Sequence, residues 1–66
     1  MNRSVSALND IRQNAQYALD FINGVQYHDF EADVQRQYAV IRALEICGEA
    51  AKRVTEETRQ AYPGIE

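Results

Sequence analysis

Apolar residues recur at intervals of three and four along two stretches of the chain, which is the spacing of an amphipathic helix. The first stretch predicts a helix over about residues 5–23, ended at Gly24, because glycine readily takes the left-handed conformation that closes a helix. The second predicts a helix over about residues 34–61, stopped by Pro63. About 28 helical residues rise roughly 42 Å, so this long helix is the element around which the chain is organised.

Residues 24–33 connect the two predicted helices; they mix aromatic and acidic side chains and show no sustained period. A connection with one short helical turn fits this pattern. Asp29 is expected to cap that turn and Asp33 to cap the long helix, each carboxylate also meeting the positive end of a helix dipole. Tyr27 and Phe30 are expected to anchor the connection to the core.

The apolar residues of the long helix cover more than half of its circumference, which is more than one short helix can bury. Gly48 lies in mid-helix, where it costs about 1 kcal/mol relative to alanine, so close approach of another backbone is the expected compensation. The sequence therefore predicts an all-α fold: a helical hairpin of one shorter and one long helix that completes a four-helix bundle by homo-oligomerisation, most simply as an antiparallel dimer. The residues expected in the oligomer interface are Val40, Ile41, Leu44, Cys47, Gly48, Ala51 and Val54.

Length and composition support the need for a partner. A chain of 66 residues forms one domain at most, and its stability as a lone monomer would be marginal. Cys47 is the single cysteine, which excludes an intramolecular disulfide and favours a reducing, cytoplasmic location. The N-terminus is polar and has no apolar run long enough for a signal peptide or a membrane span. Net charge is −3 with scattered basic residues, which gives no electrostatic footprint for nucleic acid.

The sequence offers little candidate chemistry. One histidine and one cysteine far apart do not predict a metal site, and no cofactor is expected. His28 beside Asp29 is a weak general-base candidate because no nucleophile accompanies it. The acids Asp29, Glu31 and Asp33 fit helix starts better than a site for a hard cation. On the charged side of the long helix, Glu49 and Arg53 have the spacing of an i,i+4 ion pair. The residues alone thus indicate an α-helical interaction module.

The run of residues 39–54, with Glu56, Arg59 and Pro63 beyond it, resembles the signature of the HepT-like family within the HEPN superfamily. The upstream helix and the segment before residue 34 also resemble that family, so the resemblance covers nearly the whole chain. It implies an all-α bundle that dimerises. It also implies a ribonuclease toxin of a bacterial or archaeal toxin–antitoxin pair, whose partner antitoxin is a small nucleotidyltransferase.

The catalytic signature implied by the resemblance is an arginine, then a histidine several residues on and commonly a nearby tyrosine, after the segment that begins with Pro63. No stretch of this sequence carries that motif, and His28 lies in the wrong part of the fold to replace it. We therefore expect a truncated toxin component that acts in oligomerisation or partner binding, with RNA a substrate only for a complete family member. The alternatives are part of an active ribonuclease whose catalytic segment follows, and an unrelated helical adaptor. The resemblance also implies that Arg42, Glu45 and Glu49 line the cleft from its non-catalytic side.

Overall fold

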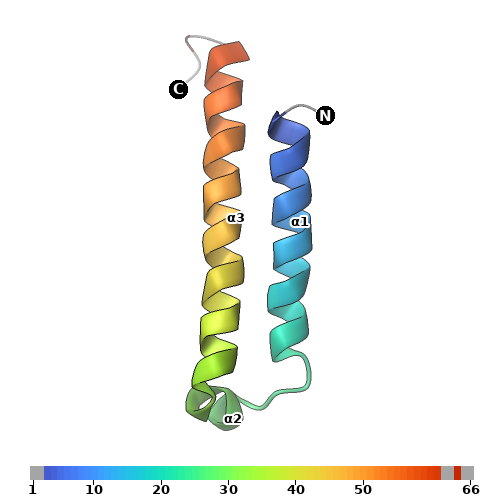
Figure 1. Ribbon diagram of the computed structural model, residues 1–66, viewed down its shortest axis with the longest axis vertical. Coiled ribbons are helices and arrows are strands. Elements are labelled where there is room, and N and C mark those ends of the chain that lie inside the picture. Colours follow the sequence, from blue (N-terminus) through green and yellow to red (C-terminus); the bar gives the residue numbers. More distant parts are fainter. Residues whose placement is uncertain (1–2, 62–63, 65–66) are drawn as a thin grey trace.

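Three helices make up the computed structural model, which describes residues 3–61 and 64. They are α1 (Arg3–Ile22), α2 (Tyr27–Ala32) and α3 (Val34–Ala61). The two long helices run side by side in opposite directions, and α2 lies at the closed end of the pair (Figure 1). No strand occurs in these residues, so the predicted all-α helical hairpin is confirmed.

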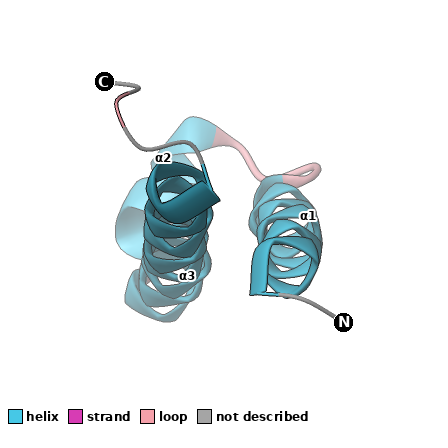
Figure 2. Ribbon diagram, turned by 90° about the horizontal axis from the view of Figure 1, so that it is seen from above, coloured by secondary structure: helices cyan, strands magenta, loops and turns pink. Residues whose placement is uncertain are grey.

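The hairpin is a single layer of helices. It measures 47 × 23 × 15 Å and has a radius of gyration of 15.3 Å, whereas a compact globule of this length would have about 11 Å. Seen along the helix axes, α1 and α3 stand next to each other, and α2 lies beside α3 at the far, closed end (Figure 2). Beyond that end, each long helix buries one stripe against the other and leaves the rest of its surface open.

The first helix ends where the sequence predicts. Gly24 has φ of +75°, a conformation that residues with a Cβ rarely adopt, and the Val25 N–H donates to the Ile22 carbonyl at 3.1 Å. The start of α1 differs slightly from the expectation, because the helix already includes Arg3. Gly24 thus turns the chain out of α1 and towards the connection.

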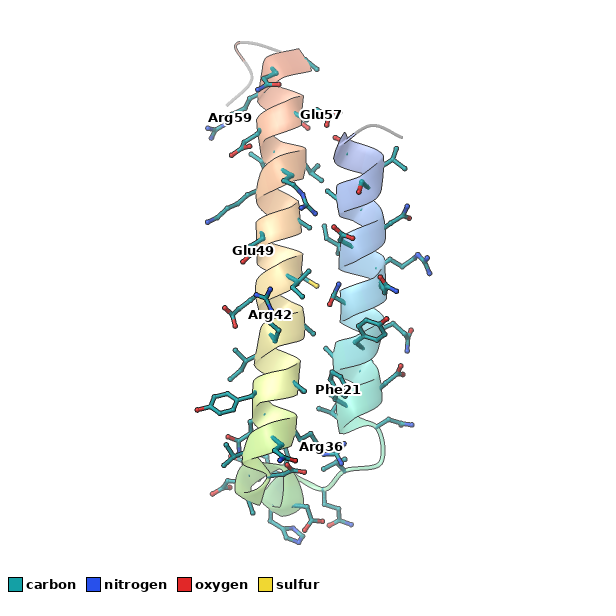
Figure 3. All side chains as sticks on the ribbon, viewed as in Figure 1. Phe21, Arg36, Arg42, Glu49, Glu57 and Arg59 are labelled. Atoms are coloured by element: carbon teal, nitrogen blue, oxygen red, sulfur yellow. The ribbon has the colours of Figure 1, made fainter. Side chains whose placement is uncertain are left out.

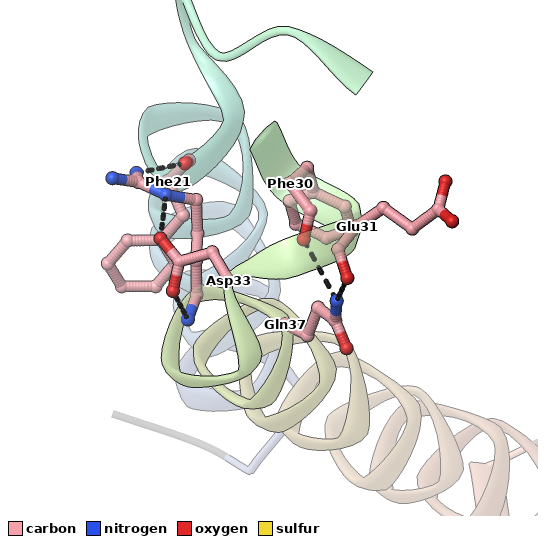
Figure 4. Close-up of polar contacts among 6 residues, drawn as sticks. Phe21, Phe30, Glu31, Asp33 and Gln37 are labelled. Carbon is pink, nitrogen blue, oxygen red and sulfur yellow. Dashed lines mark hydrogen bonds and ion pairs between the residues drawn. The ribbon is translucent and has the colours of Figure 1, made fainter. Parts of the chain in front are cut away.

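Asp33 and Arg36 hold the closed end of the hairpin together (Figure 4). Asp33 Oδ1 accepts from the Arg36 main-chain N–H at 3.0 Å, which confirms the predicted cap of α3. The Arg36 side chain donates through Nε to Asp33 Oδ2 at 3.1 Å and through Nη1 to the Phe21 carbonyl at 2.6 Å. One guanidinium therefore ties the last turn of α1 to the first turn of α3.

This arrangement predicts an acid-dependent loss of stability. The Arg36 main-chain N–H, and next the Arg36 guanidinium, lower the pKa of Asp33 below its ordinary value of 3.8. Because the folded-state pKa is the lower one, the stabilisation is fully present above the unfolded value and is lost as pH falls through the folded pKa. We expect the midpoint of thermal unfolding, followed by circular dichroism, to fall as pH drops below 3.8 and to fall less steeply for Asp33→Asn. Asp20→Asn is the control for removing an exposed carboxylate, and parallel pH curves for wild type and Asp33→Asn would contradict the prediction.

The six-residue helix α2 corrects two expectations about the connection. Asp29 does not cap it, because the N-cap position is Gln26 and Asp29 lies inside the first turn. Tyr27 does not anchor it, because its side chain is 78% exposed; Phe30 is the half-buried aromatic residue. α2 is instead held through its backbone, since Gln37 Nε2 donates to the Phe30 carbonyl at 2.8 Å (Figure 4).

The contact between α1 and α3 is built on alanines. The buried hydrophobic residues are small, so the helices can approach closely, and no large side chain is fully buried among the described residues. A contact of this kind removes little apolar area from water, and burial of apolar area is the main stabilising term of a fold. The four buried alanines are Ala7, Ala18, Ala43 and Ala50.

Candidate functional site

One broad side of the hairpin carries a shallow groove of about 240 Å³ between α1 and α3. We call it the aromatic groove, because Tyr17 and Phe21 of α1 contribute its rings. Arg42 lies at its edge on α3 and forms an ion pair with Glu49 at 3.9 Å, with both side chains well exposed (Figure 3). The full lining is Asn14, Tyr17, Phe21, Ala39, Arg42, Ala43 and Ile46.

Another ion pair, between Arg53 of α3 and Asp10 of α1, joins the two helices. The predicted pairing of Glu49 with Arg53 was therefore wrong. Arg53 Nη2 lies 2.5 Å from Asp10 Oδ2, and both side chains are partly buried. Arg53 is turned towards α1, where Asp10 offers a less exposed carboxylate than Glu49 does. Glu49 pairs instead with Arg42, two turns earlier on the same helix. Of the three charged residues implied to line a cleft, Arg42 and Glu49 form this ion pair, and Glu45 takes no part in either pair.

The other broad side is apolar. Because Phe21 and Ile46 line the aromatic groove, helix periodicity places residues just beyond the buried alanines, such as Leu19 and Leu44, on the opposite side. Leu19 is 58% exposed and Leu44 is 56% exposed. We call this surface the apolar face; its residues are Leu8, Leu19 and Ile22 of α1 and Ile41, Leu44, Gly48 and Ala51 of α3.

The residues expected in the oligomer interface divide between two positions. Ile41, Leu44, Gly48 and Ala51 are exposed on the apolar face. Val40, Cys47 and Val54 are half-buried, and the Cys47 thiol donates to the Ile11 carbonyl of α1 at 3.7 Å. Sequence reasoning missed the contribution of α1 to this surface. Its signal was present in the width of the α1 pattern, which places Leu8, Leu19 and Ile22 beside the stripe that α3 covers.

No contact within the described part of the hairpin requires glycine at position 48. A Cβ added at this position would meet nothing within 4 Å, so α1 does not make the close backbone approach that the sequence predicts. Gly48 and Ala51 instead form part of the floor of an open groove of about 300 Å³ on the outer side of α3, which Lys52 and Arg59 also line. The free-energy cost of a glycine in mid-helix is thus not offset by any contact among the described residues.

The remaining candidates carry no site chemistry. His28 Nε2 lies 3.4 Å from Asp29 Oδ1, but both side chains are largely exposed at the far end of the hairpin. Within residues 3–61 and 64, no three or more His, Cys, Asp or Glu residues are grouped to hold a metal ion. The carboxylate of Asp33, one of the acids considered for a hard cation, is occupied by Arg36. None of the described helices is both long and apolar enough to cross a membrane.

Comparison with known proteins assigns the family. A "Putative RNase MJ1380" of Methanocaldococcus jannaschii is 38% identical over 64 residues, which are 96% of this chain and 59% of that protein. A "Probable ribonuclease HepT" of Thermococcus cleftensis is 38% identical over 58 residues, 88% of this chain and 53% of that protein. The chain thus spans somewhat more than half the length of these curated relatives. No solved structure matches the chain significantly. The family model described as Ribonuclease HepT-like matches residues 11–65, so the chain belongs to the HepT-like ribonuclease family.

Proposed function

We propose that this chain is the self-associating helical scaffold of a HepT-like toxin and that it works in the cytoplasm as a component of a toxin–antitoxin pair. Its family supports the assignment to a ribonuclease toxin system. No residue of its sequence supplies the arginine-to-histidine motif that the family resemblance implies for RNA cleavage. In this proposal the segment provides structure and contacts, and RNA cleavage by a whole HepT-like protein depends on residues outside it.

The apolar face is the observation that carries the proposal. Leucine side chains that are more than half exposed occur on both long helices, and a large continuous apolar surface on a soluble protein marks an interaction site. The hairpin itself buries only alanines completely or nearly so, which leaves a lone monomer with little hydrophobic stabilisation. A second copy that stacks its own apolar face on this one supplies the missing core and makes a four-helix bundle.

A small nucleotidyltransferase antitoxin is the second partner that we propose. The aromatic groove, with the Arg42–Glu49 pair at its edge, lies on the side that self-association leaves open. A groove with exposed rings and an arginine has the composition that protein interfaces favour. Co-purification of the tagged chain with a neighbouring nucleotidyltransferase tests this part of the proposal.

Sedimentation equilibrium of the 66-residue chain tests the scaffold role. We expect a helical dimer at micromolar concentration, because each copy then buries its exposed leucines. The same preparation, incubated with a mixture of RNA substrates, is expected to leave them intact. A well-folded monomer at micromolar concentration would overturn the proposed self-association, and RNA cleavage by the purified chain would overturn the division between scaffold and catalysis.

A further inference from the structure

A row of side chains at every seventh position of α3 borders the apolar face. It consists of Tyr38, Glu45, Lys52 and Arg59, and all four are exposed. Seven residues are two helical turns, so these side chains share one flank of the helix. Within residues 3–61 and 64, neither Glu45 nor Lys52 forms an ion pair. The acid and the tyrosine occupy the first half of the row, and the two cations occupy the second half.

This row is complementary to itself only when one copy is reversed. Glu45 and Lys52 are equally far from the midpoint between residues 48 and 49, and so are Tyr38 and Arg59. In an antiparallel pair of α3 helices that cross at this point, the acid of each copy faces the cation of the other, and each arginine faces a tyrosine ring. In a parallel pair, like charges would face each other. Charges at such flanking positions set the orientation of paired helices.

The surface beside the row fits a close crossing at the same point. Gly48 is exposed at the centre, and a Cβ built there meets nothing within 4 Å. Ala51 and Thr55 follow it along the floor of the outer groove, and Leu44 is exposed one turn before it. Small residues at the centre let two helix backbones approach. Leu44 of each copy then packs against the other copy, one on either side of the crossing.

We propose that α3 pairs antiparallel with α3 of a second copy of this chain, crossing at Gly48, and that reciprocal Glu45–Lys52 ion pairs fix the orientation and register. The inference rests on the proposed self-association and adds the geometry to it. Two-fold symmetry makes each ion pair occur twice. A substitution of one residue therefore affects two contacts in the dimer.

Charge reversal measured by sedimentation equilibrium tests the register. Glu45→Lys places two cations opposite each other and Lys52→Glu places two acids opposite each other, so we expect each to raise the dissociation constant of the dimer by roughly tenfold. The double variant Glu45→Lys/Lys52→Glu restores opposite charges at both contacts and is expected to return the constant to about the wild-type value. The two single variants change the net charge in opposite directions, so an equal loss excludes an effect of net charge alone.

Glu49→Lys is the matched control, because it makes the same charge change at an exposed residue of α3 on the opposite broad side, at the edge of the aromatic groove, and it is expected to leave the dissociation constant unchanged. Single variants that dimerise like the wild type, or a double variant that stays as weak as the singles, would overturn the proposed register while self-association stands. A wild-type chain that is monomeric would overturn the proposed self-association, and the register with it.

Discussion

Replacing Ala50 by leucine is expected to lower the free energy of unfolding by about 1–3 kcal/mol, the range for forcing extra methylene groups into a close-packed contact. Ala50 is completely buried where α3 meets α1, and Ala7 on the facing helix is completely buried as well. A larger side chain has to push the two helices apart, which weakens the Cys47 contact to the Ile11 carbonyl and separates Arg53 from Asp10. In a chain this small, such a loss is a large fraction of the total stability.

Thermal and urea unfolding, followed by circular dichroism at equal protein concentrations, measure this effect. Ala61→Leu is the matched control, because it makes the same substitution at an exposed position of α3 and is expected to change the free energy of unfolding by no more than about 0.5 kcal/mol. An Ala50→Leu variant as stable as the wild type would mean that the two helices do not meet through these alanines.

Replacing Leu44 by glutamate is expected to abolish dimerisation at micromolar concentration. Leu44 is 56% exposed in the hairpin, and burying a leucine contributes about 1.5–3 kcal/mol. A symmetric dimer contains the position twice, and the hairpin already covers part of each side chain, so the loss is roughly 2–3 kcal/mol, which is one to two powers of ten in the dissociation constant. The buried carboxylates add a further desolvation cost.

Size-exclusion chromatography with light scattering gives the mass of the Leu44→Glu variant over a dilution series. Tyr17→Glu replaces another exposed residue by glutamate, but in the aromatic groove on the opposite broad side, and it is expected to remain dimeric. Because a monomer of this fold keeps little core, helicity is expected to fall together with mass for Leu44→Glu. A fully helical dimer of that variant would exclude the apolar face as the site of self-association.

Local signals in the sequence predicted the hairpin well, because each of them acts within a few residues. Gly24 ends α1 through its own backbone conformation, and Asp33 caps α3 through an amide three residues away. The pairing of Arg53 with Asp10 has a different origin, since the two residues are 43 positions apart. Their meeting depends on the rotation and register of two helices, which a pattern along one helix does not contain.

For the candidate site too, one part could be predicted from the sequence and another part depends on how the two helices pack. The period of apolar residues located the exposed part of α3 around Leu44 and Gly48, but it could not separate those positions from Cys47, which faces α1. Which residues of α3 face α1 and which are exposed depends on the line along which the two helices touch, and the buried Ala43 and Ala50 mark that line. Because alanine contributes little to a hydrophobic pattern, the most buried positions were the least conspicuous in the sequence.

The link that Arg36 makes between the Phe21 carbonyl and Asp33 also bears on how the hairpin forms. It joins residues close to the connection, so this end can close early, when only a short loop has to be ordered. Each further turn of α1 can then add to α3 in sequence, and no step requires two distant segments to find each other. Such an order of events needs only a short segment to be ordered at each step, so we expect the pairing of α1 with α3 to begin at this end.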